Sequence, residues 1–338
     1  MSKLLYCSVT SFLLALSTAS IAANTQETVA DLGASLERYE YPYTVNRFAL
    51  QSPQGELSMA YMDIRPDVAN GRSVLLLHGK NFCAAYWQAT IASLADAGFR
   101  VIAPDQIGFC KSDKPPAYAY SFHQLAANTQ ALLNHLDIEK PVVIGHSMGG
   151  MLATRFALMY PDFVEQLVLV NPIGLEDWKA KGVPYRGVSD WYERELNKDY
   201  SAIKAYQKQS YYFGDWNAAY ARWAKLLAGM YLGEDVHKVA WAQALTYDMV
   251  YTQPVVYEFG ELRVPTTLLI GQRDRTALGK DLVSDTLKSR LGDYPALGQQ
   301  AAKKIPQAEL VEFEGLGHLP HIEAPKRFQK ALLKALAQ

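Results

Sequence analysis

The chain has 338 residues, of which 49% are hydrophobic and 20% are charged, and its formal net charge at pH 7 is −1. So much apolar material with so little net charge indicates a folded globular protein and excludes intrinsic disorder. The 33 Lys and Arg residues against 34 Asp and Glu residues create no basic field, so nucleic acid is not an expected partner.

Residues 1–23 have the pattern of a secretory signal peptide. Lys3 gives a positive start, an apolar segment runs to Leu16, and Ser20 to Ala23 supply small residues where a signal peptidase could cut. A membrane anchor is the less favoured alternative, because polar residues interrupt the run and it is shorter than the roughly 20 residues of a span. We therefore predict a periplasmic or secreted protein without stable membrane insertion.

The rest of the chain begins with a predicted β-hairpin and continues with alternating strands and helices. The hairpin strands are expected at residues 44–50 and 56–64, the later strands at 73–77, 100–103, 141–144, 165–170, 266–270 and 309–313, and helices at 84–97, 121–136, 148–159 and 325–336. Ser121 and Gln124 resemble a capping box at the start of the second helix. Continuous apolar strands separated by helices predict an α/β fold, a mostly parallel sheet with helices on both faces.

The alternation is interrupted at residues 175–262. This segment holds 18 of the 39 aromatic residues, and its composition favours helices over strands. We predict a helical insertion that divides the core into residues 24–174 and 263–338.

One motif in the core has a clear chemical meaning. The sequence Gly145-His146-Ser147-Met148-Gly149 directly follows an apolar strand and precedes a helical segment. In this context G-x-S-x-G forms a tight turn that exposes the serine hydroxyl. Ser147 is therefore the predicted nucleophile, and the alternative is a glycine-rich strand exit without a catalytic role.

A serine nucleophile needs a base, and the base needs a carboxylate that fixes its tautomer. His318 is the predicted base because it follows the last strand, whereas His321 is expected to cap or pack the last helix. Asp274, at the end of the strand after the insertion, is the predicted acid. Glu176 and Asp177, after the preceding strand, are the alternatives.

The oxyanion that forms on an attacked carbonyl needs at least two fixed N–H donors. The predicted donors are the backbone N–H groups of Met148, directly after the nucleophile, and of Lys80, in the loop that begins with His78. We assign no role to the Lys80 side chain, and we interpret His78 and His146 as structural.

Two cysteines remain once the predicted signal, which contains Cys7, is removed. In an exported protein Cys83 and Cys110 predict a disulfide, and two buried free thiols are the alternative. No dinucleotide fingerprint and no metal-ligand spacing is apparent, so we expect neither a cofactor nor a metal.

Together these motifs resemble the α/β-hydrolase fold family. The His-Gly loop, the D-x-x-G-x-x-x-S segment from Asp105 to Ser112, the serine elbow, the acid and the late histidine occur in the order of that family. The resemblance implies that residues 175–262 form a lid between the sixth and seventh strands over an apolar or aromatic pocket. A helical appendage without substrate contact is the alternative. Many members have glycine in place of Cys110, and the family's loop arrangement would make a disulfide tie two active-site loops together.

The resemblance implies a serine hydrolase that cleaves a carboxylic ester of a small molecule through an acyl-enzyme. The same triad also supports carbon–carbon bond or amide hydrolysis, acyl transfer and cofactor-free peroxide chemistry. Ser147 argues against epoxide opening and halide displacement, for which family members commonly have aspartate at the elbow. A small-molecule binding protein with a lidded pocket and little turnover is the alternative from another class.

Overall fold

The structure, a computed structural model, describes residues 28–53 and 55–337, so the predicted signal peptide lies outside the described residues. An eight-stranded sheet has the order β1-β2-β4-β3-β5-β6-β7-β8. Its strands are β1 (Val45–Ser52), β2 (Gly55–Ile64), β3 (Ser73–Leu77), β4 (Arg100–Pro104), β5 (Val142–His146), β6 (Gln166–Val170), β7 (Thr266–Gly271) and β8 (Ala308–Phe313). The hairpin strands pair antiparallel with each other and β2 with β4, and every other pair is parallel. The predicted mostly parallel sheet is confirmed.

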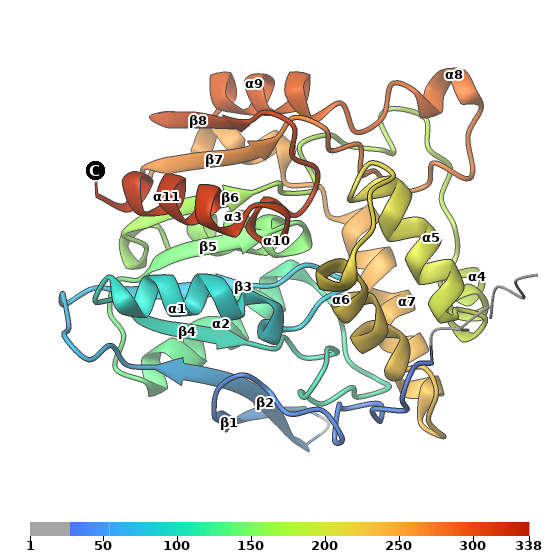
Figure 1. Cartoon of the computed structure of the whole chain (residues 1–338), viewed down its shortest axis with the longest axis horizontal. Helices are drawn as coiled ribbons and strands as arrows, with labels where there is room; N and C mark the ends of the chain where they lie inside the picture. The colour runs from blue at the N-terminus through green and yellow to red at the C-terminus, as the bar shows by residue number, and fades with distance from the viewer. Residues whose placement is uncertain (1–27, 54, 338) are drawn as a thin grey trace, which may run out of the picture.

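Helices cover both faces of the sheet, as the continuous apolar strands predicted (Figure 1). Outside residues 175–262 the helices are η1 (Ala84–Trp87), α1 (Gln88–Asp96), α2 (Phe122–His135), α3 (Met148–Met159), η2 (Pro161–Phe163), α8 (Asp285–Lys288), α9 (Tyr294–Lys304), α10 (Pro320–Glu323) and α11 (Pro325–Leu336). Of these, the short α8 lies beyond the end of the sheet and covers neither face (Figure 1). Helices α1 and α11 pack together on one face, and α2 and α3 on the other. All residues of β5, β6 and β7 are buried as a result.

Side-chain acceptors for backbone N–H groups mark where two of these helices begin. The Ser121 side chain caps α2 by accepting the Gln124 N–H at 3.0 Å. Gln124 does not return the bond, as a full capping box requires, because its side chain binds Asn128 at 2.9 Å instead. The predicted helix at 84–97 starts with one 3₁₀ turn, where Asp105 accepts the Ala84 N–H at 2.8 Å.

Four helices and a 3₁₀ segment lie between β6 and β7, and we call residues 175–262 the insertion. They are α4 (Val188–Leu196), α5 (Tyr200–Ser210), α6 (Ala218–Gly229), α7 (Val236–Thr252) and η3 (Val256–Glu261). Figure 1 shows α4 to α7 grouped beside one end of the sheet. Stacked rings pack the insertion: Trp191 on Tyr247 with centroids 4.0 Å apart, and Tyr212 on Tyr220 at 3.8 Å. None of the helices in the described part of the chain is long and apolar enough to cross a membrane.

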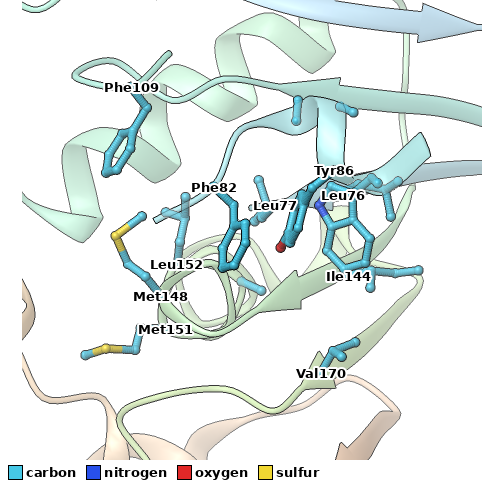
Figure 2. Close-up of a cluster of buried hydrophobic side chains, with 14 of the residues drawn as sticks. Leu76, Leu77, Phe82, Tyr86, Phe109, Ile144, Met148, Met151, Leu152 and Val170 are labelled. Carbon is cyan, nitrogen blue, oxygen red and sulfur yellow. The ribbon is translucent and has the colours of Figure 1, made fainter. Parts of the chain in front are cut away.

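The core reaches the edge of the sheet where β3 and β5 end. Figure 2 shows side chains from the strands, from the following loops and from α3 meeting there: Leu76, Leu77, Phe82, Tyr86, Phe109, Ile144, Met148, Met151, Leu152 and Val170. Close packing on several sides fixes the backbone of the turns at this edge.

A disulfide joins Cys83, after β3, to Cys110, after β4, so the predicted bridge is confirmed. Cys110 has φ 47°, in the left-handed region that favours glycine. The bridge ties together two loops at the edge of the sheet where Ser147 lies.

Reduction of this disulfide is expected to lower the free energy of unfolding by about 3.5 kcal/mol at 25 °C, because it frees a loop of 27 residues in the unfolded chain. Urea unfolding with and without dithiothreitol measures the effect. A variant with alanine at both Cys83 and Cys110 is the control, since its unfolding should not respond to the reductant. Equal midpoints for oxidised and reduced wild-type protein would contradict the expectation.

Candidate active site

Ser147 lies at the turn between β5 and α3. Its φ of 56° and ψ of −120° fall outside the helix and strand regions, so the turn holds the residue in a strained conformation. The turn has no room for side chains at its glycines: a Cβ on Gly145 would lie 2.1 Å from the Gly149 carbonyl oxygen, and one on Gly149 2.3 Å from the Leu77 carbonyl oxygen. This is the strand–turn–helix geometry that the G-x-S-x-G motif predicted.

His318 and Asp274, predicted from different strand ends, form a hydrogen-bonded pair. His318 Nδ1 lies 2.6 Å from Asp274 Oδ2, and both side chains are fully buried. Oδ2 also accepts the Asn171 amide at 2.9 Å, and Oδ1 accepts the Thr276 N–H at 2.8 Å. These contacts fix the orientation of the carboxylate and, through it, that of the imidazole ring.

The two alternative acids have other partners. Glu176 forms a salt bridge of 2.6 Å with Lys181, and Asp177 accepts the Tyr257 hydroxyl at 2.8 Å. In the part of the chain that the structure describes, neither makes a hydrogen bond or ion pair with His318. The histidine therefore lies with the acid at the end of β7 rather than with either alternative.

The segment around His318 is held from two sides. The Tyr211 carbonyl oxygen, at the end of α5, accepts the His318 N–H at 2.9 Å, and the Tyr211 ring stacks on the imidazole with centroids 4.6 Å apart. On the other side, Glu323 accepts the N–H groups of Gly317 and Leu319 at 2.9 to 3.1 Å. Burial raises the pKa of Glu323 to about 7, although these N–H donors act in the opposite direction. The insertion and the C-terminal helices together set the position of His318.

The neighbouring histidines His146 and His321 contact other parts of the fold. His146 Nε2 lies 2.9 Å from the His318 carbonyl oxygen, and its Nδ1 lies 2.8 Å from the Tyr86 hydroxyl. Burial, with the nearby His318 and His321, lowers the pKa of His146 well below its usual range. His321 packs against Phe328 of the last helix, with ring centroids 5.7 Å apart.

The Nε2 atom of His318, on the side of the ring away from Asp274, has no hydrogen-bond partner among residues 28–53 and 55–337. A hydrogen bond to Ser147 is therefore also absent in this part of the chain. Such bonds are often long in unliganded sites and shorten when substrate binds. His146 links the two segments, because it precedes Ser147 in the chain and its Nε2 contacts the His318 carbonyl oxygen.

The predicted N–H donors, Met148 and Lys80, belong to the two backbone segments at Ser147. The loop after β3 passes beside Ser147, since a Cβ on Gly79 would lie 3.1 Å from the Ser147 Cβ. His78 anchors this loop by accepting an N–H of the loop after β4 at 3.1 Å. Within the described residues we find no acceptor for the N–H of Lys80 or of Met148. Both groups are therefore free to donate to a bound ligand.

A cavity of about 610 Å³ opens beside Ser147. Lys80 and Asn81 line it from the core, and the insertion supplies much of the remaining wall, including Trp178, Trp191, Tyr206, Tyr211 and Tyr247. This volume is typical of a small-molecule site. The wall is aromatic, as expected, but it also carries several cationic side chains that the sequence analysis did not predict.

Three residues of the site were not predicted from the sequence. Asn171 directly follows β6 and could have been found by the same strand-end argument that identified Asp274. Glu323 follows His318 by five positions, at the start of the C-terminal helices, where a carboxylate commonly accepts free N–H groups. For Tyr211 we see no sequence signal beyond its place in an aromatic-rich segment.

One cluster of possible metal ligands appears among the described residues. Atoms of Cys83, Asp105 and Cys110 lie within 4.8 Å of one another. The two sulfurs are bonded to each other, whereas a metal site needs thiolates. Asp105 accepts the Tyr41 hydroxyl at 2.6 Å and the Ala84 N–H at 2.8 Å. The cluster is therefore a structural junction between loops.

Comparisons with known proteins agree with this architecture. A crystal structure of a probable hydrolytic enzyme from Pseudomonas aeruginosa PAO1 is 58% identical, with a TM-score of 0.90 over 91% of this chain and 99% of that one. A thermophilic esterase from Thermogutta terrifontis is 26% identical, with a TM-score of 0.67 over 86% and 98% of the two chains.

Curated sequences are similar over shorter stretches. An uncharacterised protein of Mycobacterium tuberculosis is 42% identical over 106 residues, 31% of this chain and 30% of that protein. Pig (Sus scrofa) bifunctional epoxide hydrolase 2 is 37% identical over 123 residues, 34% of this chain and 22% of that enzyme. The match thus spans less than a third of either relative. A model of the α/β-hydrolase fold, however, matches residues 72–325, and this extent shows that the chain belongs to the α/β-hydrolase fold family.

Proposed function

We propose that this protein is a serine hydrolase that cleaves a carboxylic ester through an acyl-enzyme. The observation that carries the proposal is the buried His318–Asp274 pair at 2.6 Å, next to a cavity that Ser147 lines. A nucleophile, a base oriented by a third group, and free N–H donors beside them are the parts that acyl transfer requires.

In the proposed reaction, Ser147 Oγ attacks the ester carbonyl while His318 Nε2 takes its proton. Asp274 stabilises the imidazolium, and the N–H groups of Lys80 and Met148 bind the oxyanion. The C–O bond to the alcohol breaks, and the alcohol leaves with the proton from His318. Water then attacks the acyl-enzyme with the same base, and the acid is released with Ser147 restored.

Ester cleavage is favoured over the epoxide opening named for the pig relative. Serine at the elbow forms an acyl-enzyme with an ester, whereas the family's epoxide hydrolases commonly have aspartate there. The Thermogutta relative, itself an esterase, is similar over nearly its whole length, and this supports the same assignment. Carbon–carbon or amide hydrolysis would use the same residues.

We further propose that the insertion acts as a lid and that residues 1–23 direct export to the periplasm or beyond. The support for a lid is that the insertion lines the cavity and contacts His318 through Tyr211. The support for export is the signal pattern, together with a disulfide of the kind that persists outside the cytoplasm.

A fluorophosphonate probe is expected to label wild-type protein at one position, Ser147, because only an activated serine displaces fluoride from phosphorus. Intact mass and peptide mapping read the adduct, and the same mass shows whether residues 1–23 have been removed. Ser147→Ala should not be labelled, whereas Ser93→Ala, on α1 away from the cavity, should be labelled like wild type. Unlabelled wild-type protein would favour the binding-protein alternative.

A further inference from the structure

The Lys80 side chain is a buried cation without a counter-ion. Lys80 is 8% exposed and lines the cavity with Ser147. Its Nζ donates to Gln243 Oε1 at 2.7 Å and lies 3.4 Å from the centre of the Tyr247 ring. Both partners are neutral, and within residues 28–53 and 55–337 the ammonium forms no ion pair. Burial of an unpaired charge is unfavourable, so a bound anion would stabilise this group.

The carboxylate near Lys80 is already neutralised. Glu195 is fully buried, and it accepts both Lys198 Nζ and the Tyr231 hydroxyl. Lys198 therefore balances Glu195, and within the described residues no carboxylate is left to pair with Lys80. Burial lowers the pKa of Lys80 well below its usual range, and Glu195 opposes this shift without cancelling it.

Most other charged residues of the cavity wall are also cationic. Its cationic residues are Lys80, Arg194, Lys198, Arg275, Lys280 and Lys288, and its one acidic residue among those described is Asp281. Asp281 is shared by Arg194 and Arg186, at 2.5 and 2.7 Å. A low-dielectric cavity with an excess of cations attracts and concentrates anions.

An unpartnered amide adds to this polar wall. Gln207, on α5, is fully buried and lines the same cavity, and neither atom of its amide has a hydrogen-bond partner among the described residues. Buried amides without partners are rare in proteins because each lost hydrogen bond is costly. A polar ligand in the cavity would supply the missing bond.

From this geometry we infer that the natural substrate is an ester that carries a second, free carboxylate, bound by Lys80 Nζ. The inference rests on the proposed function, and it names the substrate class. The Lys80 backbone N–H binds the oxyanion, and its ammonium is only a four-carbon stem away. The free carboxylate is therefore separated from the reacting carbonyl by a short spacer, which the Tyr247 and Trp191 rings contact.

The first test measures binding without turnover. Ser147→Ala protein is titrated calorimetrically with monomethyl glutarate and with dimethyl glutarate, its neutral counterpart. We expect the acid to bind about 10- to 100-fold more tightly, as for a hydrogen bond to a charged group. In Ser147→Ala/Lys80→Met this preference should disappear, and in Ser147→Ala/Lys80→Arg part of it should return. Equal binding of the two compounds would overturn the inference.

The second test measures selectivity in turnover. p-Nitrophenyl monoesters of succinate, glutarate and adipate are compared with their methyl-capped forms. We expect kcat/KM to favour the free acid about 10-fold or more at one spacer length, and Lys80→Met to bring the ratio near 1. Lys303→Met, which removes an exposed charge on α9, should keep the wild-type ratio.

The outcomes separate the two proposals. Faster cleavage of the methyl-capped esters, or an unchanged ratio in Lys80→Met, would overturn the carboxylate site while leaving ester hydrolysis intact. No cleavage of any ester, together with no fluorophosphonate labelling, would refute the proposed function. Selective binding of monomethyl glutarate would then still support an anion site at Lys80.

Discussion

Replacing Asp274 with asparagine is expected to lower kcat for ester hydrolysis about 10⁴-fold, the size of effect that the same change has in other serine triads. In this site Oδ2 accepts two donors, His318 Nδ1 and the Asn171 amide, and Oδ1 accepts the Thr276 N–H. An asparagine has one oxygen and one NH₂ group, so it cannot accept at both positions.

Either orientation of that asparagine is unfavourable. With NH₂ at the Oδ2 position, it faces the Asn171 amide and donates to His318 Nδ1, which moves the ring proton to Nε2. A protonated Nε2 cannot accept the proton of Ser147. With NH₂ at the Oδ1 position, it faces the Thr276 N–H, and the loop after β7 must shift.

Steady-state hydrolysis of a p-nitrophenyl ester by wild type and Asp274→Asn measures the loss, with circular dichroism to verify folding. Asp177→Asn is the matched control, because Asp177 was the alternative acid and it binds Tyr257 instead of the histidine. We expect kcat of this control to stay within a few-fold of wild type. A loss of less than 10-fold in Asp274→Asn would remove Asp274 from the proposed mechanism.

The sequence was sufficient for those features of the fold and site that depend on local pattern. Strand ends are local, and parallel strands bring their carboxyl ends to one edge of the sheet, so Ser147, Asp274 and His318 could be predicted from their places after strands. Local pattern alone does not predict the Cys83–Cys110 disulfide, because the bond depends on the relative position of two loops. The resemblance to the family supplied that position.

Features that depend on how the insertion docks could not be predicted. Tyr211 contacts His318 and also Asn81, which donates to its hydroxyl at 2.8 Å across 130 positions of sequence. Lys80 meets Gln243 across 163 positions. No periodicity or motif encodes such pairs, because the orientation of α5 and α7 over the sheet is set by packing of many side chains at once. The charge of the cavity therefore emerged only from the structure.

The site is also expected to make the fold sensitive to acid. His78, His146 and His321 are buried, and burial lowers the pKa of each from its usual 6.5, to about 3 for His321. Below pH 6.5 these groups bind protons in the unfolded chain but not in the folded one. Stability is therefore fully present above pH 6.5 and is lost as the pH falls.

Glu323 acts in the opposite direction. Its pKa is raised from 4.5 to about 7, so the folded protein binds a proton that the unfolded chain does not between these values. Its contribution to stability is thus present at low pH and is lost as the pH rises toward 7. The raised pKa of Glu323 offsets the effect of about one buried histidine on stability. Because three histidines lower stability in acid and Glu323 alone raises it, the protein is expected to lose stability as the pH falls.

The contribution of one histidine, His321, to this pH dependence of stability can be measured separately. Its ring stacks on Trp87 with centroids 4.5 Å apart, and neither nitrogen has a hydrogen-bond partner among the described residues. Its pKa is 6.5 in the unfolded chain and about 3 in the folded protein, so this group lowers the free energy of unfolding by about 2 kcal/mol as the pH falls from 7 to 5. Leucine has a volume similar to that of histidine, does not titrate and leaves no unpaired polar atom. In His321→Leu the part of the pH dependence of stability that comes from His321 should therefore vanish.

Urea unfolding at pH 7, 6 and 5 measures this difference. Wild-type protein should lose about 2 kcal/mol more than His321→Leu over this range. His123→Gln, which removes an exposed histidine on α2, is the control and should follow the wild-type curve. Parallel curves for wild type and His321→Leu would mean that the fold opens enough to protonate His321 before it unfolds. Because His321 packs on Trp87 and Tyr86, and Tyr86 holds His146 beside His318, activity should then fall at a higher pH than stability.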